Sequence, residues 1–296
     1  MIPRWYTSAV GTIGDRSGTD ADPWGNSATV THMEMGMLRA RHVSRRDFLA
    51  GLTAVAASSR ASLGAAWTDP PVIAKRVEKL YRIAGCRQPN DLQFVSGGLW
   101  VLDQVDPNKA FKVRPEDGSI LQTLQTESIH GSGITYGNGA LWIASTKMID
   151  PAAPPRTLKV DPKTGKTLKS WVTPGSGLYG RVTTPSGAHG LKWVDGKYWM
   201  AVPASGKLFL MEPETGEIVR SIPAPGVRTH GLAWDHGFLW CVESDGRAIY
   251  KLDSKDGVPV ARIQLTKDDP EPHGLDINDG VLWYCDAASG WICRLT

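Results

Sequence analysis

The sequence predicts an all-β protein, a five-bladed β-propeller closed by an N-terminal strand in its last blade. Three observations support this fold class. A tryptophan motif occurs five times, the copies are spaced as propeller blades are, and the last copy is one strand short. In addition, no segment beyond Trp67 shows a sustained helical period.

Each copy of the motif aligns on a tryptophan. The copies read PNDLQFVSGGLWVLD, GSGITYGNGALWIAS, AHGLKWVDGKYWMAV, HGLAWDHGFLWCVES and HGLDINDGVLWYCDA, with the tryptophans Trp100, Trp142, Trp199, Trp240 and Trp283. The positions ten residues earlier are 90, 132, 189, 230 and 273, so successive copies lie 42, 57, 41 and 43 residues apart. A propeller blade has this length. The long second interval places insertions at TKMIDPAAPPR and PGSGLYGRVTTPSGA.

A second shared block follows four of the tryptophans. It reads FKVRPEDGSILQTL, LKVDPKTGKTLKSW, LFLMEPETGEIVRSI and IYKLDSKDGVPVARI. In each block an alternating apolar strand meets a tight turn and a second alternating strand leaves it, so each blade has four strands. The last copy ends after three strands, at GWICRLT. The segment AKRVEKLYRIAG, near residues 74–85, is predicted to supply the fourth and so remove exposed sheet edges.

The chain before the repeats indicates export. HVSRRDFLAGLTAVAASSRASLGAA resembles the twin-arginine signal of bacteria, because Arg45 and Arg46 precede Phe48 and Leu49 and a short apolar run ends in small residues. That run is too short to span a membrane. We expect a dispensable or disordered extension over residues 1–36, a twin-arginine signal peptide over 37–66 and the propeller domain over 67–296. The protein would then meet the twin-arginine translocase and be periplasmic or secreted; the alternative is a cytoplasmic protein with a basic tail.

The charge of the propeller domain argues against a nucleic-acid partner. The whole chain has a net charge of +3, and residues 1–66 hold 7 Lys and Arg against 5 Asp and Glu. The remainder therefore carries 26 basic and 25 acidic groups, a net charge of +1. A nearly neutral body is a poor counterion for DNA or RNA.

Histidines gather at the start of the first strands of the blades. His189, His230 and His273 lie ten residues before a blade tryptophan, where the first two blades have Asn90 and Ser132. First strands line a propeller's channel, so ring closure should bring these residues to one end of it. Three or four histidines with a carboxylate suit a divalent ion such as Zn²⁺, Mn²⁺ or Fe²⁺, with Mg²⁺ also considered. The predicted metal ligands are His130, His189, His230 and His273, His130 lying one strand period before Ser132.

Carboxylates recur three residues after the tryptophans, where the second strand returns to the face on which the first began. Glu243 and Asp286 occupy this position in the last two blades. A histidine beside a carboxylate can perform acid–base catalysis, so His230 with Glu243 and His273 with Asp286 are predicted catalytic pairs. The alternative is structural: a histidine that begins a blade can serve only to hydrogen-bond a neighbouring turn. The predicted substrate-binding residues are Asn90, Tyr179, Arg181 and Arg228.

The unit HGLAWDHGFLWCVES resembles the repeat of the streptogramin B lyase (virginiamycin B lyase) family, in which Pro-His-Gly-Ile leads to Leu-Trp-Phe-Thr-Glu. It is also similar to the wider superfamily that includes the SMP-30-type lactonases. The resemblance covers roughly residues 86–296. It implies a metal-assisted elimination that opens a lactone, with His230 and Glu243 at the positions of the family's catalytic pair.

This chain departs from the lyase pattern in having fewer blades and more channel histidines. Plant-type glutaminyl cyclases are five-bladed as well, but their blades typically begin with Gln rather than His. The sequence thus favours an exported, metal-dependent lyase or hydrolase acting on a small ester- or lactone-type molecule at the channel mouth. The alternative is a non-enzymatic propeller that binds a ligand or a protein, and a third hypothesis is a redox protein with copper or iron at the histidines.

Overall fold

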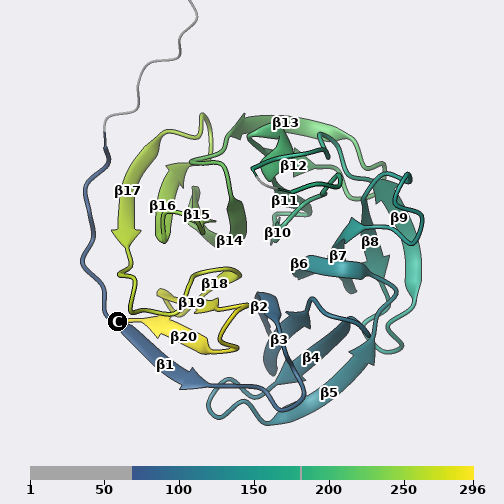
Figure 1. Cartoon of the computed structure of the whole chain (residues 1–296), viewed down its shortest axis with the longest axis horizontal. Coiled ribbons are helices and arrows are strands. Elements are labelled where there is room, and N and C mark those ends of the chain that lie inside the picture. Colours follow the sequence, from purple (N-terminus) through teal and green to yellow (C-terminus); the bar gives the residue numbers. More distant parts are fainter. Residues whose placement is uncertain (1–68, 181) are drawn as a thin grey trace, which may run out of the picture. The chain divides into compact units, whose positions relative to one another are not determined.

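The blades are antiparallel sheets of four strands arranged in a ring (Figure 1), as the sequence predicted. The computed structural model describes residues 69–180 and 182–296, so the expected extension and signal peptide lie outside the described residues. Blade one contains β2 (Pro89–Val95), β3 (Gly98–Asp103), β4 (Lys109–Val113) and β5 (Ile120–Gln125). Blade two contains β6 (Ile129–Gly137), β7 (Ala140–Lys147), β8 (Arg156–Val160) and β9 (Thr167–Val172).

The third and fourth blades repeat this order. Blade three contains β10 (Gly190–Val194), β11 (Lys197–Val202), β12 (Lys207–Met211) and β13 (Ile218–Pro223), with a short 3₁₀ helix, η1 (Pro203–Ser205). Blade four contains β14 (Thr229–Asp235), β15 (Phe238–Glu243), β16 (Ala248–Asp253) and β17 (Pro259–Gln264). In the part of the chain that the structure describes, no helix is long and apolar enough to cross a membrane.

The last blade contains both ends of the ring. Its strands are β18 (Leu275–Asn278), β19 (Val281–Cys285) and β20 (Ile292–Leu295), and β1 (Val77–Tyr81) is its outer strand. β1 pairs antiparallel with β20, with Val77 opposite Leu295 (Figure 1). Arg294 Nε also donates a hydrogen bond of 2.7 Å to Glu78 Oε2 across this pair. The predicted closure by the N-terminal strand is therefore confirmed.

The repeated tryptophans lie between neighbouring blades. All five are buried on the second strand of their blade. Trp142, for example, stacks on Trp171 and Tyr198 with ring centroids 5.4 and 5.1 Å away, and its neighbour Trp193 comes from blade three. Large aromatic rings thus fill the wedge between sheets that diverge from the axis.

The inner strands β2, β6, β10, β14 and β18 surround the channel closely because most blades have glycine after the histidine position. A side chain at Gly190 or Gly231 would collide with the backbone of the next blade. Blade one instead has Asp91, whose carboxylate accepts backbone N–H groups of Leu92, Ile134 and Leu275 at 2.9, 2.9 and 3.2 Å. This carboxylate joins blades five, one and two at the axis.

Candidate functional site

The three histidines of the blade repeat form a row at one end of the channel. The ring centroids of His189 and His230 are 4.6 Å apart, and those of His230 and His273 are 4.2 Å apart. All three are buried. A bulge surrounds His230, since the register of β14 and β15 shifts between Thr229 and Leu232, and a bulge re-aims the side chains around it. The expected convergence on one channel end is what the structure shows.

Burial keeps these imidazoles uncharged. It lowers the pKa of His273 to about 3 and holds the pKa values of His189 and His230 well below their ordinary value. The Arg228 guanidinium and the neighbouring histidines lower these pKa values further. Neutral imidazoles at neutral pH are competent to accept a proton.

The hydrogen bonds of His230 determine which nitrogen can do so. Nδ1 lies 3.0 Å from the carbonyl oxygen of Arg228, which can only accept, so Nδ1 carries the proton. Ser244 Oγ lies 3.2 Å from the same nitrogen but donates its own proton to the Pro272 carbonyl at 2.8 Å, so it also accepts from Nδ1. The lone pair of His230 is therefore on Nε2, which makes no hydrogen bond to any described residue.

His189 has the same tautomer but a blocked lone pair. Ser132 donates to Asn90 Oδ1 at 2.5 Å, so its Oγ accepts from His189 Nδ1 at 3.1 Å. The other nitrogen, Nε2, then accepts from Ser186 Oγ at 2.9 Å or from Tyr179 at 3.2 Å. Of these two histidines, His230 has the accessible basic nitrogen.

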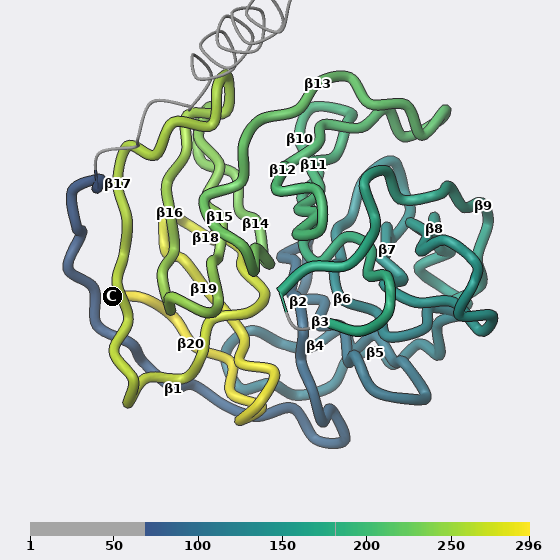
Figure 2. The backbone as a smooth tube through the Cα atoms, turned by 45° about the horizontal axis from the view of Figure 1, so that its top comes forward, coloured from purple at the N-terminus to yellow at the C-terminus, as the bar shows by residue number. Residues whose placement is uncertain are grey.

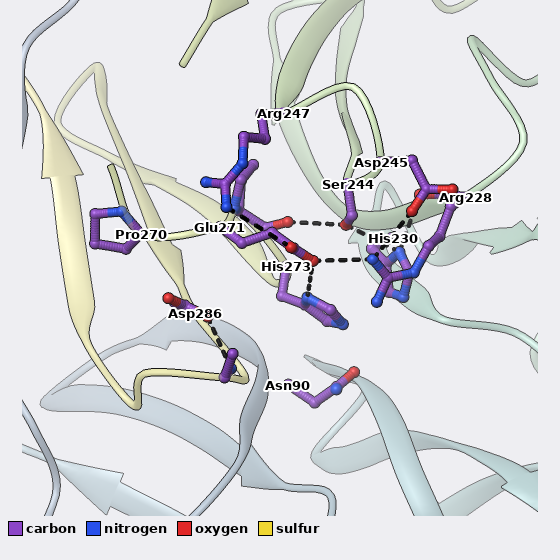
Figure 3. Close-up of polar contacts among 12 residues, drawn as sticks. Asn90, Arg228, His230, Ser244, Asp245, Arg247, Pro270, Glu271, His273 and Asp286 are labelled. Carbon is purple, nitrogen blue, oxygen red and sulfur yellow. Dashed lines mark hydrogen bonds and ion pairs between the residues drawn. The ribbon is translucent and has the colours of Figure 1, made fainter. Parts of the chain in front are cut away.

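A cavity of about 620 Å³ opens beside this row. Its lining includes Tyr179, which contacts His189, and Arg228, which precedes His230 by two residues. Arg228 pairs with Asp245 and Glu271 at 3.3 and 2.9 Å (Figure 3). Val182 and Val227 add exposed apolar surface to the lining. The chain between β9 and β10, which carries Tyr179, reaches toward the centre of the ring (Figure 2). The cavity therefore offers both polar donors and an apolar wall.

The channel on the other side of the histidines is filled by a second polar layer. Lys192 forms a buried ion pair with Asp276. Gln93 donates to Asp276 at 2.9 Å and accepts from Thr135 at 2.7 Å. All four side chains come from inner strands, three residues after the blade position that holds the histidines. Access to the histidines is thus from the cavity side.

The predicted carboxylates have other partners. Glu243 accepts the backbone N–H of Arg228 at 3.1 Å and that of Gly246 at 2.6 Å. Asp286 accepts the N–H of Ala288 at 2.7 Å and lies apart from His273 (Figure 3). Among the described residues, no hydrogen bond or ion pair joins either carboxylate to a histidine. The carboxylate nearest a site histidine is instead Glu271, whose Oε1 lies 3.8 Å from His273 Nδ1.

Of the remaining predicted residues, some lie at the candidate site and others do not. Asn90, Tyr179 and Arg228 lie at the histidine row or the cavity. His130 is half-buried, with its pKa lowered to about 4 by burial and by Lys147, and none of the ring contacts of the row includes it. Arg181 lies outside the described residues.

The described side chains do not fit a metal as they lie. No group of three or more His, Cys, Asp or Glu residues in the described ranges has a metal-binding arrangement. His189 has both ring nitrogens hydrogen-bonded, and His230 has only Nε2 for a ligand bond. The predicted metal dependence therefore stays a prediction, and we derive no step through an ion.

Several site residues could have been found by reading the repeat further. Glu271 lies two residues before His273, where blade four has the predicted Arg228, and the position three after the histidine holds Lys192 and Asp276 in blades three and five. Aligning these positions across the blades would have placed them at the channel. Ser186 and Ser244 carry no such signal, because they come from a long connection and from a turn.

Replacing Glu243 with glutamine is expected to lower stability but to leave turnover within about threefold of the wild type. Gln keeps one carbonyl oxygen for the Arg228 N–H but presents an NH₂ group to the other backbone donor. The loss of one charge-assisted bond should cost roughly 1–3 kcal/mol. Urea unfolding and steady-state kinetics on the same preparation measure both effects. A 100-fold fall in kcat would show that Glu243 acts in catalysis, as the sequence alone suggested.

Comparisons with known proteins support the fold. No protein-family model matches the chain, and no curated protein matches it either. Among solved structures, a glutaminyl cyclase from Myxococcus xanthus aligns with a TM-score of 0.59 and 12% identity, covering 76% of this chain and 97% of that one. A virginiamycin B lyase from Staphylococcus aureus aligns with a TM-score of 0.43 and 20% identity over 70% of this chain and 66% of that one. At this identity the first alignment shows only the fold. Together with the five four-stranded sheets, it shows that this chain is a β-propeller protein.

Proposed function

We propose that the protein is an exported lyase or hydrolase that acts on a small ester- or lactone-type molecule in the cavity beside the histidine row. The observation that carries the proposal is the buried, uncharged His230, whose Nδ1–H is held by a backbone carbonyl and whose Nε2 lone pair is unused. A positioned neutral imidazole of this kind is suited to act as a general base. A glutaminyl cyclase shares this fold, so a propeller of this kind can carry an enzyme site.

The proposed chemistry needs one proton transfer at His230 Nε2. In hydrolysis the imidazole takes a proton from water as the water oxygen bonds to the carbonyl carbon, and it returns the proton to the leaving alcohol oxygen. In elimination it takes the proton from the carbon next to the carbonyl, and the leaving oxygen departs with the electron pair of its C–O bond. Arg228 and Tyr179 line the cavity and are placed to bind the polar part of the substrate. Val182 and Val227 would contact its apolar part.

A screen of turnover tests the proposal directly. The purified full-length protein is incubated with a panel of γ- and δ-lactones, short aryl esters and cyclic depsipeptides, and product is followed by mass spectrometry. Turnover of one class above the rate of the His230→Asn variant supports the proposal. Saturable binding without turnover for every class would favour the alternative, a binding propeller.

Dependence on a metal is a separate expectation with its own measurement. If the side chains alone perform the chemistry, EDTA dialysis should change kcat by less than about twofold. Elemental analysis and calorimetric titration with Zn²⁺ and Mn²⁺ accompany the assay. Loss of activity on dialysis, restored by either ion, would instead establish the metal-dependent form of the enzyme that the histidine count suggested.

Export by the twin-arginine route is proposed from Arg45 and Arg46 alone. Replacing both with lysine should leave most of the precursor in the cytoplasm, because the translocase reads the arginine pair. Cell fractionation with an antibody to the propeller measures the distribution. A periplasmic fraction equal to that of the wild type would remove this part of the proposal.

A further inference from the structure

Two buried polar atoms at the histidine row have no hydrogen-bond partner among the described residues. They are Nδ2 of Asn90 and Nδ1 of His273. Their side chains are only 1% and 7% exposed. An unpaired buried donor is costly, roughly 1–3 kcal/mol, so such groups in a native protein commonly face a bound molecule. That both unpaired atoms belong to one site points to a ligand there.

The two atoms come from adjacent blades. The inner strands β2 and β18 are neighbours, since Asp91 of the former accepts the Leu275 N–H of the latter. Asn90 lies across from the imidazoles of His273 and His230 (Figure 3). The unpaired atoms therefore lie at the same histidine row as the proposed base.

The hydrogen bond from Ser132 settles how the Asn90 amide is used. Ser132 Oγ donates to Asn90 Oδ1, so the oxygen of the amide is occupied and its NH₂ group is left as a donor. A neutral amide donor requires an oxygen acceptor. The carboxylate nearest the row, Glu271, already accepts from Arg228 at 2.9 Å.

We propose that Asn90 and His273 form an oxygen-binding subsite that holds the carbonyl oxygen of the substrate, with Asn90 Nδ2 as donor. This inference rests on the proposed function. It adds the side chain that stabilises the negative charge developing on the substrate oxygen. As His230 Nε2 takes the proton, the electron pair of the carbonyl π bond moves onto this oxygen. The amide N–H then strengthens its hydrogen bond to the oxygen. The His273 imidazole lies beside this oxygen, with its Nδ1 3.8 Å from Glu271 Oε1.

The Asn90→Asp variant separates this role from a structural one. Aspartate keeps the oxygen that accepts from Ser132, replaces the NH₂ donor with an acceptor and adds a negative charge that opposes a developing oxyanion. Removal of one oxyanion donor typically costs 100- to 1,000-fold in kcat. We expect kcat to fall by at least about 100-fold with KM changed by less than about fivefold. The matched control is Asn138→Asp, the same change at an exposed turn, which should leave kcat unchanged.

A binding measurement that needs no turnover keeps this inference distinct from the proposed function. γ-Butyrolactone is titrated into full-length protein while the imidazole C–H signal of His273 is followed by NMR. A saturable shift is expected in the wild type and in Asn138→Asp, with affinity at least about 10-fold weaker in Asn90→Asp, equal to about 1.4 kcal/mol. The absence of a saturable shift in the wild type, or an unchanged affinity in Asn90→Asp, would overturn the subsite. If instead the subsite binds the lactone while His230→Asn has no effect on any turnover, the proposed function fails and the subsite stands.

Discussion

Replacing His230 with asparagine is expected to lower kcat/KM by roughly 100- to 10,000-fold, the usual contribution of a general base. Asparagine is chosen because its side-chain NH₂ can take the place of Nδ1–H and donate to the Arg228 carbonyl. The variant then loses the Nε2 lone pair but keeps the hydrogen bond to the Arg228 carbonyl at the start of β14. Circular dichroism and the urea midpoint should therefore stay close to those of the wild type.

The matched control for this variant is His236→Asn. His236 is fully exposed, at the turn between β14 and β15, and its backbone has a positive φ of 45° that asparagine tolerates well. The control thus makes the same His-to-Asn change in the same blade, at a residue that is exposed where His230 is buried. Unchanged turnover in this control, with loss in His230→Asn, would assign the effect to the base. Equal turnover in both variants would contradict acid–base chemistry at the row.

The pH profile gives an independent reading of the same residue. Burial holds the folded pKa of His230 well below its ordinary value near 6.5, so the imidazole stays unprotonated as the pH falls through 6.5. Activity should then show no half-maximal point near pH 6.5. The unfolded chain does bind protons below that pH, so folding stability should fall as the pH drops through 6.5 toward the lower folded values. A profile of kcat/KM from pH 4 to 9 measures the first effect.

The fold could be predicted from the sequence because every blade repeats the same local chemistry. Each tryptophan fills the wedge between two sheets, and each Asp/Gly turn joins two alternating strands, so spacing alone determined blade number. The need for a fourth strand in the last blade followed from the number of strands in each repeat. Without β1, the edge of β20 would be left unpaired. These are properties of short segments, which a repeat makes visible several times over.

The site was predicted only in part because repetition does not reveal which partner a side chain takes. The structure places the three histidines together, as the repeat implied, since one slot in each blade must face the axis. The carboxylate position was found by the same periodicity, but Glu243 is bound to backbone N–H groups of loops outside the repeat. Whether a carboxylate turns toward a histidine or a loop depends on the loop conformation, which alternation does not encode. Pairing of Arg228 with Glu271, across two blades, likewise appears only after ring closure.

Asp91 presents the opposite case, a polar residue whose importance the repeat concealed. The other four blades have glycine at its position, so it looked like a single deviation. Its carboxylate is fully buried and accepts three backbone N–H groups from three different blades. Burial raises its pKa well above the ordinary value, and the three N–H bonds oppose this shift. Because these three N–H groups belong to the inner strands of three blades, the ring should depend on this carboxylate.

Replacing Asp91 with alanine is expected to destabilise the propeller by roughly 3–5 kcal/mol, because three buried N–H groups lose their acceptor while the burial cost of the carboxylate is removed. Asp91→Gly, which gives blade one the residue of the other blades, should be as harmful, since it too lacks an acceptor. The control is Asp117→Ala, an exposed carboxylate that bonds to nearby Ser119 and forms an exposed ion pair with Arg114 at 3.7 Å, with an expected change below about 0.5 kcal/mol. Urea unfolding of the three variants measures these differences. If both Asp91→Ala and Asp91→Gly unfolded at the wild-type urea concentration, the carboxylate would not be what holds the inner strands together.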